Sequence, residues 1–176
     1  MKYCTITNIF TAFLIFIICY FAWCFYDFNR KIVDIRVGKV VVESGIDTNV
    51  IKSKHDTVPE SITVSPGDTV HVEYILTRYR TAIAISERIF EDYEDKTFHT
   101  STAMRIIDYN QLGENQKNVG QFRIPLLSRE GCNNEIYTKI YYDLFFNIMT
   151  FMKPILVESP RVSVCVDGNS PLKLVR

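Results

Sequence analysis

The chain has 176 residues, equal numbers of basic and acidic side chains at 20 each, and a hydrophobic fraction of 47%. The first 26 residues hold one Lys and no acid, so the remainder has a net charge of about −1. This near-neutral balance argues against nucleic acid as a partner, because phosphate binding needs clustered basic side chains. The remaining residues, about 150, suffice for one domain with its own core.

Residues 1–28 predict a transmembrane anchor. No charge lies between Lys2 and Asp27, and residues 9–26 (IFTAFLIFIICYFAWCFY) are almost wholly apolar. At about 1.5 Å per residue, a helix of this length reaches across the roughly 30 Å core of a bilayer. The aromatic residues at the end of the run suit the headgroup level. Arg30 and Lys31 follow, where their long side chains reach lipid phosphates. The lipid bilayer is therefore the first expected partner.

A cleaved signal peptide and a buried core helix are the alternatives to an anchor. A signal peptide ends in small residues at its cleavage site, whereas this run ends in large ones such as Trp23 and Phe25. Orientation has arguments on both sides. Basic residues after the span favour a cytoplasmic domain by the positive-inside rule, but a very short N-terminal tail is typical of a signal anchor. We expect a single-pass protein whose C-terminal domain lies outside the cytoplasm, in a periplasmic or extracellular location.

Beyond the anchor the pattern changes from helical to strand-like. Alternating or β-branched runs predict strands at 32–42, 61–65, 69–77, 81–91, 97–107, 120–127, 136–146, 155–157 and 161–166. The segment 81–91 also fits a helix, although its Ile residues fit a strand slightly better. Pro66-Gly67-Asp68 predicts a tight turn. Residues 43–60 and 109–118 read as loops, 91–96 as a turn, and 147–153 as a bulged turn. With no helix expected after the anchor, residues 29–176 predict an all-β domain, an antiparallel immunoglobulin-like β-sandwich.

Two segments carry a resemblance to known domains. PGDTVHVEY (66–74) and SPRVSVCV (159–166) resemble the strand edges of immunoglobulin-like or fibronectin-type domains. The layout of the whole chain is similar to small single-pass membrane proteins of phages and prophages that carry an exported immunoglobulin-like domain. The Cys…Trp…Cys pattern of immunoglobulins does not occur, because the one Trp, Trp23, lies in the anchor. The resemblance implies a phage-encoded protein that acts in the host envelope.

Cys132 and Cys165 are the two cysteines of the expected domain, and the other three lie within the first 24 residues. A lone pair of cysteines in an exported domain often forms a disulfide. The alternative is two unpaired thiols, one in a turn at Cys132 and one buried in a strand at Cys165. A bridge also requires that the two Cα atoms lie within about 7 Å.

No pattern predicts catalytic, cofactor-binding or metal-binding residues. His55, His71 and His99 lack a partner at the spacing of a metal site. Arg78 and Arg80 are two residues apart and would share a face of a strand. They are the candidates for contact with an anionic group or with the acids of a partner, and a solvated face is the alternative.

The leading functional hypothesis is a non-enzymatic, membrane-anchored binding or scaffolding module. Its expected partners are the bilayer and another membrane or envelope protein. A structural subunit of a larger membrane assembly is one alternative. An envelope hydrolase is another, although it would need a cluster of carboxylates or a Ser/His pair that the sequence does not display.

Overall fold

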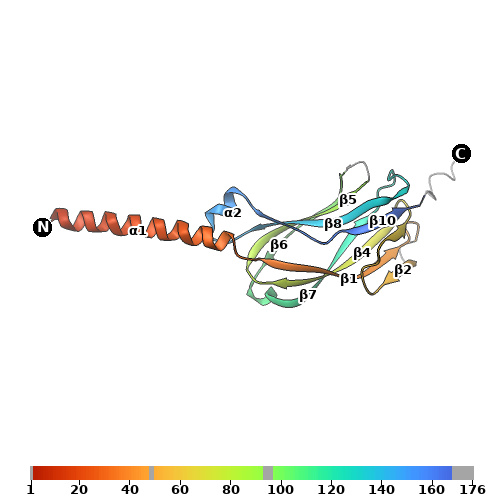
Figure 1. The fold of residues 1–176 in the computed structure, drawn as a ribbon, viewed down its shortest axis with the longest axis horizontal. Coiled ribbons are helices and arrows are strands. Elements are labelled where there is room, and N and C mark those ends of the chain that lie inside the picture. Colours follow the sequence, from red (N-terminus) through yellow and green to blue (C-terminus); the bar gives the residue numbers. More distant parts are fainter. Residues whose placement is uncertain (1, 48–49, 93–96, 168–176) are drawn as a thin grey trace.

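The computed structural model describes residues 2–47, 50–92 and 97–167. Helix α1 (Lys2–Phe28) projects from one end of a β-rich body (Figure 1). One helix of the described chain, Asn8–Phe28 with a mean hydropathy of 2.2, is long and apolar enough to cross a membrane. Large apolar side chains are exposed all around it, including Phe10, Phe13 and Phe16. An apolar surface of this kind is stable when lipid rather than water surrounds it.

Two sheets form the β-rich body. The first has the order β2-β1-β4-β7 and is antiparallel throughout. Its strands are β1 (Val33–Glu43), β2 (Ile51–His55), β4 (Thr69–Arg78) and β7 (Gly113–Arg123). The second has the order β3-β10-β8-β5-β6, with β9 also paired to β8. Its strands are β3 (Ile62–Val64), β5 (Ala82–Glu91), β6 (Thr97–Ile107), β8 (Gly131–Asp143), β9 (Ile155–Glu158) and β10 (Val162–Val166).

Both sheets contribute to one hydrophobic core. Along β4, buried residues alternate with partly exposed ones, so Val70, Val72 and Leu76 point inward. They belong to the same buried cluster as Phe90 on β5 and Ile136 on β8, which come from the other sheet. Each such side chain contributes about 1.5–3 kcal/mol when it is fully buried. The alternation in the sequence thus directs apolar side chains of each sheet toward the other, and their packing holds the two sheets together.

The turn expected at Pro66-Gly67-Asp68 is confirmed. Gly67 has a φ of +90°, and the amide of Asp68 donates to the carbonyl of Ser65 at 3.0 Å. The Asp68 carboxylate is buried and accepts from the Ser65 amide at 2.8 Å, the Gly45 amide at 2.9 Å and Lys52 Nζ at 2.8 Å. The turn therefore fixes the neighbouring loops at the end of the domain remote from α1.

Four expectations need correction. The domain is mostly β and mostly antiparallel, but β3 runs parallel to β10, with Thr63 opposite Cys165. The expected loop 43–60 contains β2, and β7 begins inside the expected loop 109–118. These polar segments form strands because each pairs with a neighbour, β1 and β4 respectively. A short helix, α2 (Ile148–Met152), replaces the expected bulged turn because Asn147 caps it.

Candidate functional site

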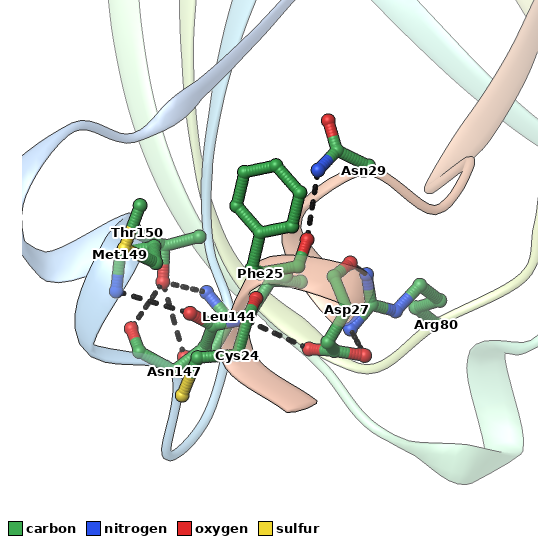
Figure 2. A network of polar contacts seen from close by, with 9 residues as sticks. All are labelled: Cys24, Phe25, Asp27, Asn29, Arg80, Leu144, Asn147, Met149 and Thr150. Atoms are coloured by element: carbon green, nitrogen blue, oxygen red, sulfur yellow. Dashed lines mark hydrogen bonds and ion pairs between the residues drawn. The ribbon is translucent and has the colours of Figure 1, made fainter. Parts of the chain in front are cut away.

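The last turn of α1 is held against the domain by a buried ion pair. Asp27 ends the uncharged run, and its carboxylate pairs with the guanidinium of Arg80, which follows β4 (Figure 2). Arg80 also donates to the main-chain carbonyl of Asp27. Both side chains are almost fully buried. A charge pair at this depth needs close contact to offset the loss of its hydration, so the helix is docked on the domain rather than loosely tethered.

Asn147 completes the junction from the opposite side. Its Nδ2 atom donates to Asp27 Oδ2 and to the Cys24 carbonyl, both at 3.0 Å. Its Oδ1 atom accepts from the Met149 amide at 3.0 Å and so caps α2. Thr150 supports the same turn, because its hydroxyl accepts from the Leu144 amide at 3.0 Å (Figure 2). One amide side chain therefore joins α1 to α2.

Exposed apolar residues surround this junction and form what we call the apolar collar: Phe146, Ile148, Phe151, Met152 and Tyr109. Phe146 and Phe151 are 88% and 82% exposed. Two hollows flank the helix, one of ≈ 350 Å³ beside Tyr20 and one of ≈ 540 Å³ beside Trp23, and Phe146 lines both. Exposed apolar side chains that gather beside two hollows favour a contact site over scattered exposure.

The apolar collar lies beside the helix, not beyond its end. The Tyr20 hydroxyl donates to the Phe146 carbonyl at 2.9 Å, and Asn147 bonds to the Cys24 carbonyl. Tyr20 and Cys24 precede the helix end at Phe28 by eight and four residues, which corresponds to about 12 and 6 Å. The edge of the domain therefore reaches back along the apolar part of α1.

Cys132 and Cys165 are joined by a disulfide with a Cα–Cα distance of 3.8 Å. The two residues lie on the adjacent antiparallel strands β8 and β10, where the register shifts between Val164 and Val166. The bridge thus fastens the last strand to the long central one. It lies at the end of β8 remote from the junction, because Tyr142, at the other end of that strand, pairs with β9 next to α2.

Arg78 and Arg80 do not meet on one surface. β4 ends at Arg78, which is buried and lines a cavity between the sheets. Arg80 lies beyond the strand and serves the junction with Asp27. The prediction that both residues share one face of a strand is wrong, because β4 ends at Arg78 and Arg80 lies outside it.

A buried polar contact connects the two sheets. The Thr138 hydroxyl on β8 donates to the Tyr74 hydroxyl on β4 at 3.2 Å, and the Ser159 hydroxyl lies 3.5 Å from the same oxygen. Burial raises the pKa of Tyr74, while these two hydroxyls partly oppose the rise. The contact satisfies the polar atom of an inward Tyr, and its atoms form no nucleophile–base pair.

Among the histidines, His71 pairs with Glu43 across β4 and β1 at 2.9 Å, and His55 ends β2. The side chain of His99 lies outside the described part of the chain. Within the described residues no group of three His, Cys, Asp or Glu side chains is placed to hold a metal ion.

Of the three junction residues, the sequence singles out Arg80 as a candidate contact residue but not Asp27 or Asn147. Asp27 stood out only as the first acid after the apolar run, and Asn147 belongs to no motif. They lie 120 residues apart in the chain, so only the fold brings them together. The one hint in the sequence is an acid placed directly after a long apolar run, because an acid that is buried there needs a cation opposite it.

No family model matches the chain, and no curated protein matches it. Among solved structures, a β-glucosidase involved in saponin metabolism from intestinal bacteria is similar with a TM-score of 0.34 and 14% sequence identity. The match covers 76% of this chain and 16% of the β-glucosidase chain. A similarity at this level shows neither the fold nor the function of this chain.

Proposed function

We propose that the chain is a single-pass membrane protein and a non-enzymatic binding or scaffolding module, with an immunoglobulin-like domain held directly on the bilayer surface. The observation that carries the proposal is the docked junction: Asp27, Arg80 and Asn147 fix the domain to the end of an apolar helix. A rigid connection presents the loops of the domain at a set distance and angle from the membrane. Such presentation is useful for a protein that engages a membrane or envelope partner.

The apolar collar is proposed to lie in the headgroup region of the membrane. From Lys2 to Tyr20 the helix rises about 27 Å, close to the roughly 30 Å of a hydrocarbon core. When the core occupies this N-terminal part of α1, Phe146 lies at its boundary, because its carbonyl accepts a hydrogen bond from Tyr20. Aromatic side chains favour this interface, so lipid headgroups cover the collar in this position of the helix.

The domain is proposed to lie outside the cytoplasm. The Cys132–Cys165 bridge supports this location, because disulfides persist in oxidising compartments. The resemblance of the layout to phage and prophage membrane proteins supports a host envelope as the setting. A Leu127→Cys variant tests the side of the membrane, since Leu127 is exposed. It follows the end of β7, which pairs with the start of β4 at Thr69, whereas α1 docks beyond the other end of β4 at Arg80. An impermeant maleimide should label this variant in intact cells. Labelling only after lysis would place the domain in the cytoplasm.

Single-Trp variants in vesicles test the position of the collar. Trp23 is the one Trp of the chain, so Trp23→Phe gives a silent background for Phe13→Trp, Phe151→Trp and Leu127→Trp. Brominated phospholipids in the vesicles quench Trp fluorescence only near the bromines. We expect quenching at position 13 by bromines near the bilayer centre, quenching at 151 by bromines near the headgroups, and none at 127.

The three positions separate the parts of the proposal. Position 127 is the matched control, because an apolar, exposed residue is replaced there too. Quenching at position 13 but not at 151 would support the membrane anchor and contradict the placement of the collar in the membrane. The absence of quenching at position 13 would contradict the anchor itself.

A further inference from the structure

A slot between the two sheets is lined by three arginines: Arg78 on β4, Arg88 on β5 and Arg105 on β6. Ser86 and Asn118 lie on the same cavity, whose volume is ≈ 60 Å³. The register of β5 and β6 places Arg88 and Arg105 on the same face of the sheet, four positions apart along β5, since Arg105 pairs with Ala84 and Arg88 with Ser101. Among the described residues that line the slot there is no Asp or Glu. Three arginines therefore border one cavity whose described lining offers them no carboxylate.

Arg78 forms the closed end of the slot. It is 8% exposed, and its Nε atom has no hydrogen-bond partner among the residues that the structure describes. Burial lowers the pKa of Arg78, the nearby Tyr142 opposes this, and the charge of Arg105 lowers it further. A buried guanidinium beside a second cation is costly unless an anion compensates it. Two other buried charges of the domain have a partner of opposite charge: Asp27 pairs with Arg80, and Asp68 pairs with Lys52.

Arg88 and Arg105 form the open side. Arg88 is partly buried, and its Nη1 atom donates to Ser101 Oγ at 3.0 Å, which holds the side chain across β6. Arg105 is exposed. The slot is thus closed at Arg78 and reachable from solvent past Arg105, which is the arrangement that an entering anion requires.

We propose that this slot binds one phosphate-type oxyanion, held by the guanidinium groups of Arg78, Arg88 and Arg105. The planar donors of Arg match the oxygens of phosphate, and three cations match a dianion better than a single carboxylate. The cavity has about twice the volume share of one water molecule. It therefore takes a single phosphate group, either free inorganic phosphate or the headgroup phosphate of a lipid whose other atoms stay outside the slot, past Arg105. This site is independent of the proposed scaffolding function.

Calorimetric titration of the full chain with inorganic phosphate, in a phosphate-free nonionic detergent at constant ionic strength, tests the proposal. We expect saturable binding at one site per chain. Arg105→Gln should weaken phosphate binding at least about tenfold, because one charge-assisted hydrogen bond to the phosphate is lost. This variant removes an exposed side chain, so folding should survive, and circular dichroism checks that it does. The matched control is Arg123→Gln, an exposed arginine outside the slot with the same charge change, which should bind like the parent.

A second titration in phosphatidylcholine vesicles distinguishes the two sources of phosphate. Weaker binding of inorganic phosphate in vesicles than in detergent means that lipid headgroups occupy the slot, and equal binding means a soluble ligand. Heats in detergent that match those of a chloride titration would overturn the proposal. An equal loss of affinity in Arg105→Gln and Arg123→Gln would overturn it too, because binding would then follow net charge rather than the slot. If Arg105→Gln misfolds, Arg88→Gln takes its place under the same criteria.

Discussion

Replacing Asp27 by Asn tests whether the junction holds the helix and the domain together. The substitution keeps the shape of the side chain and an oxygen that can accept from Asn147 Nδ2, now 3.0 Å away, but it removes the negative charge. Arg80 would then be buried without a counter-charge, because both side chains of the pair are only about one-tenth exposed. Breaking a buried pair from one side costs about 3–5 kcal/mol. We expect the lower end, about 3 kcal/mol, since the pair lies at the edge of the domain.

The assay is urea unfolding of the full chain in nonionic micelles, followed by near-ultraviolet circular dichroism. A loss of about 3 kcal/mol moves the midpoint by roughly 1–3 M for m values of about 1–3 kcal/mol/M. The double variant Asp27→Asn/Arg80→Gln should recover about 2 kcal/mol relative to the sum of the single variants, because no charge is left unpaired. Asp34→Asn is the matched control, since its pair with Lys31 is exposed, and it should not move the midpoint.

The reasoning would be refuted if Asp27→Asn and Asp34→Asn behaved alike. It would also be refuted if the two substitutions at the junction were additive, because the pair would then contribute no coupling. In either case the ion pair would not be what holds the helix on the domain, and the proposed fixed presentation would lose its main support.

Three further outcomes are expected in the same unfolding assay. Cys132→Ser opens a bridge with a sequence separation of 33 and should cost about 3–4 kcal/mol; two free thiols in the unreduced parent would disprove the bridge. Asp68→Ala leaves two amides and Lys52 without their acceptor and should cost about 3 kcal/mol; a loss below about 1 kcal/mol would contradict the role of the turn. Burial raises the pKa of Tyr142 to about 12, above the unfolded value of about 10. The folded state then holds its proton longer, so stability is full below pH 10 and falls from pH 10 to 12, by up to about 1.4 kcal/mol per pH unit. Tyr142→Phe should flatten this fall, and an unchanged slope would show that Tyr142 titrates normally.

The features that the sequence predicted well are local ones. The uncharged run of α1 and the alternation of Val70, Val72 and Tyr74 on β4 each depend on neighbouring residues only. The Pro66-Gly67 turn is local for the same reason, because glycine permits the φ of +90° found there.

The features that it missed depend on distant partners. β2 and the first half of β7 are polar, and they become strands because β1 and β4 offer them unpaired edges. The parallel pairing of β3 with β10 joins segments about 100 residues apart, which no local pattern encodes. No local pattern singles out Arg105, and only the fold places it on the same cavity as Arg78 and Arg88.

Retention of the intact chain in the membrane is the most direct test of the anchored module. Membranes from cells that express the full chain are washed with alkaline carbonate, and the pellet and supernatant are examined by mass spectrometry. We predict the whole 20.5 kDa chain in the pellet, because exposing the apolar surface of α1 to water is costly. A soluble product that lacks the first 26 or so residues would contradict the anchor, since the N-terminal helix would then be a cleaved signal.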